Sequence, residues 1–194
     1  AGLAAAPPAG GDLSAPAAVV TVFSEGLVGI MRQADVLGFE GRRQAFEPLL
    51  AEALDMTAFA GGAIGAKAWK ALEDADRARY LAAFESYTLA TYASRFDGYA
   101  GQSIEPAGER AGPQGTRLVG TRLVAPSEEP VSIDYLMREG PEGWRIIDVF
   151  VAGGLSETAR HRSEFAAPLA RGGIEGLIAV LDSKVDTLAA EASP

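Results

Sequence analysis

The only histidine, His161, is one of two side chains that we single out as candidates for acid–base chemistry. It lies between Arg160 and Arg162, in a segment whose pattern predicts the polar face of a helix. A histidine that acts as a general base also needs an orienting partner. We therefore interpret His161 as an ordinary surface residue. With one histidine and no cysteine, only carboxylates remain as metal ligands, so the sequence predicts no metal site.

Asp148 is the second candidate, because it lies in an otherwise apolar stretch over residues 144–151. Strand alternation places it on one face with Trp144, Ile146 and Phe150. A buried carboxylate is paired with a cation or has a raised pKa. It could abstract a proton, as a strand carboxylate does in small cone-shaped isomerases and dehydratases. It could also form a structural ion pair, which we favour, with Arg95, Arg160 or Arg162 as the partner.

The common catalytic and phosphate-binding motifs are absent from the sequence. There is no glycine-rich phosphate loop with a lysine, no serine-nucleophile motif and no HExxH sequence. The net charge of −9 argues against nucleic acid and against electrostatic docking on anionic membranes, since both need a basic field. The net charge therefore predicts no nucleic-acid partner.

Three consecutive segments, 116–124, 131–139 and 144–151, have the pattern of β-strands. In the middle segment Val131, Ile133, Tyr135 and Met137 share one face. The Gly140–Gly143 turn predicts a hairpin between the second and third segments. Residues 103–106 indicate an edge strand, because proline donates no ladder hydrogen bond. We expect an α+β fold with a curved antiparallel sheet of about four strands, wrapped on one face by helices.

The remaining segments predict helices over residues 16–37, 41–54, 67–72, 75–96, 157–170 and 174–188, with a short helix after Asp55. Gly38 should end the first helix, Pro48 should kink or break the second, and Gly172-Gly173 should separate the last two. No apolar run approaches the roughly 18 residues of a membrane-spanning helix. We expect residues 1–15 to be a disordered, processed N-terminus and residues 16–194 to form a single domain.

The helices and the sheet carry more large apolar side chains than their lengths require. As a set these residues could fill a core or line an apolar cavity between the two layers, and periodicity does not separate the two alternatives. The candidate ligand-binding residues are Met56, Phe59, Ile64, Trp69, Tyr80, Phe84, Tyr87, Val131, Ile133, Tyr135, Met137, Ile147 and Val149.

Several motifs, taken in their order and spacing, resemble one known family. They are Ile64-Gly65-Ala66-Lys67-Ala68-Trp69, the run from Asp76 to Phe84, Trp144-Arg145-Ile146-Ile147-Asp148-Val149, Arg162-Ser163-Glu164-Phe165 and the run from Gly173 to Ile178. Over about residues 20–188 the chain resembles the MlaC, or toluene-tolerance auxiliary, family of periplasmic lipid-binding proteins. Residues 160–165 and 170–173 resemble its hopanoid-associated HpnM branch. The chain departs from the family pattern at 151–155, where a shorter turn is expected.

The resemblance implies a periplasmic lipid carrier without a cofactor or catalytic activity. Such a carrier holds phospholipid acyl chains, or a hopanoid, in an apolar cavity between the layers. It exchanges lipid with an inner-membrane transporter of the ABC or RND type and with an outer-membrane lipoprotein complex, and it acts as a monomer. Two alternatives stay open: a cone-fold isomerase or dehydratase that uses Asp148, and an interaction module with an exposed apolar patch and no ligand.

Overall fold

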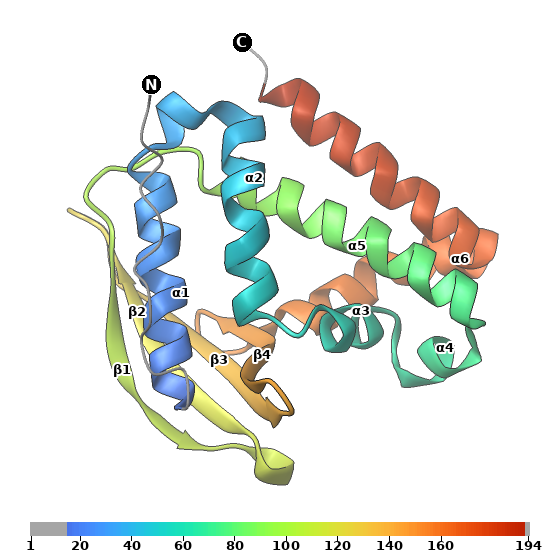
Figure 1. Ribbon diagram of the computed structural model, residues 1–194, viewed down its shortest axis with the longest axis horizontal. Coiled ribbons are helices and arrows are strands. Elements are labelled where there is room, and N and C mark those ends of the chain that lie inside the picture. Colours follow the sequence, from blue (N-terminus) through green and yellow to red (C-terminus); the bar gives the residue numbers. More distant parts are fainter. Residues whose placement is uncertain (1–14, 193–194) are drawn as a thin grey trace.

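The computed structural model describes residues 15–192. Within them the strands β1 (Ser103–Ala111), β2 (Arg117–Val124), β3 (Val131–Gly140), β4 (Gly143–Val151) and β5 (Leu155–Ser156) form one antiparallel sheet in the order β1-β2-β3-β4-β5. The 3-10 turn η1 (Pro113–Gly115) joins the first two strands. The expected α+β fold with a curved sheet is confirmed, with four long strands and the two-residue β5 beside them (Figure 1).

Two irregularities adjust the pairing of the sheet. The register of β1 against β2 shifts between Pro106 and Glu109, so β1 continues beyond the proline at which the sequence pattern ended. The second irregularity lies between β3 and β4. Leu136 pairs with Asp148, but the next residue of β3, Met137, pairs with Ile146. The extra residue in β4 is Ile147, so strict alternation fails there.

The bulge decides which side chains of β4 face the helices. Ile146 is fully buried in the core, and Val149 packs against the same core. Strict alternation would give that face to Ile147 and Val149 instead, and would place Ile146 on the face of Asp148. The sequence assignment of Ile147 to the inner face was wrong for this reason, because nothing in the order of the residues marks the position of the bulge.

Two antiparallel helices, α1 (Pro16–Met31) and α2 (Ala34–Ala53), lie beside the sheet. The expected first helix is shorter than predicted, because a turn at Arg32 and Gln33 separates it from the start of α2. Gly38 breaks the helical path with φ 60° and ψ −176°, so the predicted break at this residue is confirmed. The helix then continues through Pro48, whose predicted break is absent from this described segment.

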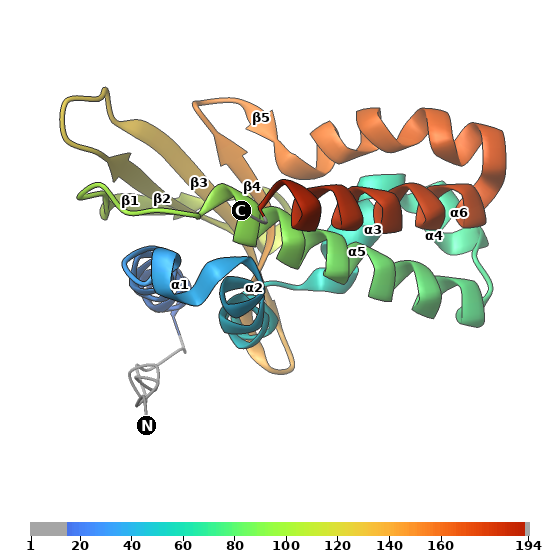
Figure 2. The same cartoon turned by 90° about the horizontal axis from the view of Figure 1, so that it is seen from above.

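A second group of helices contains α3 (Met56–Ile64), α4 (Ala66–Ala71), α5 (Asp74–Arg95) and α6 (Glu157–Glu191). Asp55 caps α3 by accepting a hydrogen bond from the backbone N–H of Ala58 at 2.8 Å. Gly173 interrupts α6 with φ 61° and ψ −156°, which confirms the predicted break between the last two helices. The two halves of α6 fold back beside α5 (Figure 2).

The views in Figures 1 and 2 show α1 and α2 on one side of the sheet, with the group α3–α6 extending beyond β4. One continuous core joins these parts, and its largest fully buried side chains include Phe46, Tyr80, Phe84, Met137 and Phe165. The expected N-terminal segment, residues 1–15, lies outside the described residues except for Ala15. Among the described helices, none combines the length and the apolar character that crossing a bilayer requires.

Candidate functional site

The candidate functional site is an internal cavity where the sheet meets the helices. The cavity has a volume of about 130 Å³. Phe23 and Leu27 of α1 face it from one side, and Ile133 and Tyr135 of β3 face it from another. Helix α5 supplies the longest stretch of wall, because residues three and four apart share one helix face. Those α5 residues are Phe84, Tyr87, Thr88, Thr91, Tyr92 and Arg95.

A second, larger hollow lies elsewhere and has a different character. It is a groove of about 560 Å³ between α1 and the strands β1 and β2. Charged and polar side chains stand along it, including Glu25, Arg32, Gln102 and Glu109. We regard the smaller cavity as the candidate site, because apolar and aromatic side chains dominate its wall and a few polar groups converge at one place.

The structure brings many of the predicted ligand-binding residues together on this cavity. Those that line it are Met56, Phe59, Phe84, Tyr87, Ile133, Tyr135 and Val149. They come from α3, α5, β3 and β4, which are distant in sequence. The structure places these side chains in the cavity wall, and their contact with a ligand stays a prediction.

The other predicted residues lie away from the cavity. Tyr80 is fully buried and donates a hydrogen bond to the carbonyl of Ala60 at 3.0 Å, so it belongs to the core. Trp69 packs against the Tyr80 ring, with ring centroids 6.3 Å apart. Ile64 lines a separate crevice of about 300 Å³ between α3 and α6. The residues that line none of the described cavities are Trp69, Tyr80, Val131, Met137 and Ile147.

Sequence reasoning missed three parts of the wall. Helix α1 contributes Phe23 and Leu27, whose apolar stripe was visible in the sequence but indicated only packing. The strand ends contribute Ile104, Leu123 and Val151. The first turns of α6 contribute three polar members of the wall, namely Glu157, Arg160 and His161.

His161 is buried, at 8% exposed, and its prediction as a surface residue was wrong. Its ring stacks on Phe165 at a centroid distance of 5.2 Å and meets the edges of Phe84 and Tyr87. The sequence contained a signal for this position, since Phe165 stands four residues further along and shares the helix face. Burial, together with the charge of Arg160, lowers the pKa of His161 to about 4, so the imidazole is neutral at pH 7.

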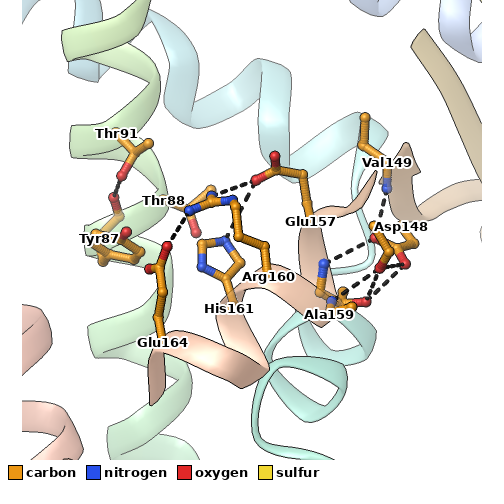
Figure 3. Close-up of polar contacts among 12 residues, drawn as sticks. Tyr87, Thr88, Thr91, Asp148, Val149, Glu157, Ala159, Arg160, His161 and Glu164 are labelled. Atoms are coloured by element: carbon orange, nitrogen blue, oxygen red, sulfur yellow. Dashed lines mark hydrogen bonds and ion pairs between the residues drawn. The ribbon is translucent and has the colours of Figure 1, made fainter. Parts of the chain in front are cut away.

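Arg95, Glu157, Arg160 and His161 form the polar end of the cavity, and Figure 3 shows the last three beside α5. Arg160 donates hydrogen bonds to Glu157 and to Glu164, both at 2.6 Å. Burial raises the pKa of Glu157, but the hydrogen bond and charge of Arg160 outweigh burial, and the net shift is downward. Glu157 is therefore ionised at neutral pH, within a network that stays charged.

Asp148 has a structural role, and the predicted ion pair was wrong. Its carboxylate accepts hydrogen bonds from the backbone N–H of Val149 at 2.8 Å and of Thr158 at 3.1 Å. It also accepts from the hydroxyls of Ser156 and Thr158. None of the described arginines is paired with it. Asp148 lines none of the three cavities described above, so they give no support to the enzyme alternative that depends on it.

The candidate metal ligands do not gather anywhere in the described chain. Within residues 15–192 no three His, Asp or Glu side chains are close enough together to hold a metal ion. The chemistry that the cavity offers is therefore apolar contact over most of its wall and charged hydrogen bonds at one end.

The fold and cavity together define a class: an α+β protein in which a curved antiparallel sheet and a helical layer enclose an apolar site. The family model for the MlaC protein matches residues 23–183. The chain belongs to the MlaC family, as the motifs in its sequence predicted. A solved structure of a phospholipid-binding protein from Ralstonia solanacearum, in complex with a phospholipid, is similar in fold. It is 21% identical, with a TM-score of 0.78, over 90% of this chain and 98% of that one.

Proposed function

We propose that this protein binds the acyl chains of a phospholipid in the cavity between the sheet and the helices. The observation that carries the proposal is the apolar and aromatic wall with charged side chains at one end only. Each methylene removed from water contributes roughly 0.8 kcal/mol, so one long chain supplies on the order of 10 kcal/mol. The phospholipid found in the Ralstonia solanacearum relative of the same fold supports this choice of ligand.

The size of the cavity implies that binding includes a change of shape. Its 130 Å³ is below the roughly 300–1,000 Å³ of ordinary ligand pockets. An acyl chain therefore enters only if the wall moves outward. Side chains with several rotatable bonds, such as Met56, and the seam between the sheet and α5 allow this without unfolding the core.

The carrier role follows from the family and is part of the same proposal. The protein acts in the periplasm, takes lipid from or delivers it to an inner-membrane transporter of the ABC or RND type, and exchanges it with an outer-membrane lipoprotein complex. It acts as a monomer. A hopanoid is the alternative ligand, since a rigid polycyclic lipid would also be held mainly by apolar area.

The test is mass spectrometry of an organic extract from protein purified without detergent. A phospholipid at close to one molecule per chain is the expected result, and a hopanoid at that level would assign the alternative ligand. A folded protein whose extract contains neither lipid, and which takes up neither from vesicles, would contradict the proposal. Transfer between donor and acceptor vesicles then separates a carrier from a protein that only stores lipid.

A further inference from the structure

Helix α6 presents one of its faces to two hollows in succession. Glu157 and His161 line the cavity, whereas Phe165 and Leu169 line the crevice between α3 and α6. These residues follow one another at intervals of four, so their side chains lie on the same face of the helix. An interval of four residues spans about 6 Å along the helix axis. The crevice therefore begins about one helical turn beyond the cavity.

Helix α3 has the same relation to both hollows. Met56 and Phe59 line the cavity, and Ala63 and Ile64 line the crevice. Phe59 and Ala63 are four residues apart, which again places them on one helix face. Since α3 and α6 pack against each other, the cavity and the crevice follow one another along the seam between these two helices.

Aromatic rings separate the two hollows. The ring of His161, which lines the cavity, stacks on the ring of Phe165 at a centroid distance of 5.2 Å. Phe84 and Tyr87 also line the cavity, and they meet the Phe165 ring edge-on at 6.4 Å and 6.2 Å. Phe165 itself lines the crevice. Its side chain therefore contacts the wall of the cavity on one side and borders the crevice on the other.

The two stacked rings are held by packing and by no hydrogen bond within the described chain. Nδ1 of His161 has no partner there, and Nε2 lies 4.0 Å from Glu157, which is too far for a hydrogen bond. The side chain of Phe165 has no polar atom. Pro168, three residues further along, has no N–H to donate to the carbonyl of Glu164, so α6 lacks one helical hydrogen bond beside these rings. The rings can turn aside without breaking a hydrogen bond.

The walls of the crevice suit an apolar occupant. The crevice has a volume of about 300 Å³. Arg162 is the charged side chain in its wall, and it donates two hydrogen bonds to the carbonyl of Gly62, at 3.0 Å and 2.8 Å, so its guanidinium is already paired. The other side chains in the wall are apolar, namely Ala63, Ile64, Phe165, Ala166, Leu169 and Ala170.

We propose that the crevice receives the end of an acyl chain when the rings of His161 and Phe165 turn aside, and that it thereby sets the chain length that the protein accepts. This inference rests on the proposed function, because it names the part of the same lipid that the small cavity leaves without a place. The cavity of 130 Å³ and the crevice of 300 Å³, once joined, reach the roughly 300–1,000 Å³ of ordinary ligand pockets.

The experiment measures which chain lengths the protein selects. Delipidated protein is incubated with vesicles that contain equal amounts of dimyristoleoyl, dipalmitoleoyl and dioleoyl phosphatidylglycerol, and the lipids bound to the re-isolated protein are counted by mass spectrometry. These lipids share one headgroup and differ by two methylenes in each chain. The readout is the ratio of dioleoyl to dimyristoleoyl lipid in the bound fraction.

Ala166→Trp fills the crevice, because Ala166 lines it. This variant should lower the ratio by about fourfold for each methylene that the filled crevice leaves in water. The matched control is Ala167→Trp. Ala167 is the next residue of α6 and is exposed, as Ala166 is, but it lines none of the described cavities. The control should keep the wild-type ratio.

A second pair of variants tests the separating ring itself. Phe165→Ala removes that ring and should raise the ratio above the wild-type value, because a long chain then reaches the crevice without displacing it. Phe39→Ala is the control, since Phe39 lies in a separate core cluster and lines none of the described cavities. Circular dichroism establishes that each variant is folded, and Ala166→Trp carries the test if Phe165→Ala does not fold.

The outcomes separate this inference from the function on which it rests. Folded wild-type protein that takes up none of the three lipids would overturn both. Wild-type protein that takes up lipid, together with an Ala166→Trp variant that keeps the wild-type ratio, would overturn the role of the crevice and leave lipid binding standing. The role of the crevice would also be wrong if Ala167→Trp lowered the ratio as much, or if Ala166→Trp reduced the uptake of all three lipids equally.

Discussion

Asp148 accepts hydrogen bonds from the backbone N–H and the hydroxyl of Thr158 at the start of α6. The Ser156 hydroxyl in turn accepts from the N–H of Ala159 at 3.0 Å. A helix begins with backbone donors that have no partner inside the helix, and these two side chains satisfy them. The same contacts join β4 to α6, and α6 supplies most of the polar end of the cavity. The carboxylate of Asp148 in the apolar strand β4 therefore fixes the position of α6.

The first prediction concerns the replacement Asp148→Ala. It should lower the free energy of unfolding by about 2–3 kcal/mol, because it removes a charged acceptor and leaves buried donors unpaired. Urea unfolding at neutral pH measures the change. The control is Asp134→Ala, which removes a surface pair with Arg110 at 3.1 Å and should cost less than about 1 kcal/mol. Equal effects of the two variants would show that Asp148 is an ordinary surface carboxylate.

The second prediction concerns pH and His161. The pKa of His161 is about 4 in the folded protein and near 6.5 when the chain is unfolded. As pH falls through this window the unfolded chain takes up a proton that the folded chain does not. Stability is therefore fully present above about pH 6.5 and falls toward pH 4, by about 2 kcal/mol between about pH 7.5 and pH 5.

The replacement His161→Phe tests this assignment, because it removes the only histidine while keeping an aromatic ring in the cluster with Phe165. Urea unfolding at the two pH values should show that most of the dependence is gone. The pKa of Glu157 is lowered from 4.5, so Glu157 changes the free energy of unfolding only below about pH 4.5, outside the range that is compared here. A variant that keeps the wild-type dependence would assign the titration to other groups.

At the scale of secondary structure, the break in α6 places both of its halves against α5. Gly173 has φ 61° and ψ −156°, a backbone conformation that is essentially restricted to glycine. Arg79 and Glu175 form a bidentate ion pair between α5 and α6 just after this break. The break therefore determines where the second half of α6 runs.

The third prediction compares two adjacent glycines. Gly173→Ala should destabilise the protein by about 1–3 kcal/mol, because alanine is strained in this conformation. Gly172→Ala should be neutral or stabilising by up to about 1 kcal/mol, since alanine is the better helix former. A Cβ at either position has no heavy atom within 4 Å, so backbone conformation alone distinguishes them. Thermal unfolding of both variants measures the difference, and equal stabilities would show that the break tolerates any residue.

At the scale of the whole molecule, two of the described hollows adjoin both α1 and the sheet, and our proposal assigns the ligand to the smaller one. The 560 Å³ groove lies between α1 and strands β1 and β2. The 130 Å³ cavity lies between the sheet and α5, where apolar side chains from distant segments meet. Volume alone would select the groove. The composition of the wall selects the cavity, because a lipid chain is held by apolar area.

The fourth prediction separates the two hollows with one type of substitution. Thr91 lines the cavity and Thr21 lines the groove, and each donates to the backbone carbonyl four residues earlier in its helix. Thr91→Trp should reduce the phospholipid recovered per protein several-fold, because the larger side chain occupies the cavity. Thr21→Trp should leave it unchanged. Mass spectrometry of organic extracts measures both, and the reverse result would assign the ligand to the groove.

The sequence by itself determined the class of fold, because alternation in residues 131–139 and helical periodicity elsewhere are local properties of the chain. It also determined the family and the breaks at Gly38 and Gly173. Each of these follows from short-range pattern or backbone conformation, which a linear sequence records.

Only the tertiary structure decided which apolar residues face the cavity and which polar residues join them. The bulge at Ile147 places Ile146, instead of Ile147, on the inner face of β4. Tyr80 donates a hydrogen bond to a backbone carbonyl of α3. His161 was expected at the surface but lies at the polar end of the cavity, because α5 packs against its side of α6. These outcomes depend on which side of each element a distant segment covers, and that information arises only when the chain has folded.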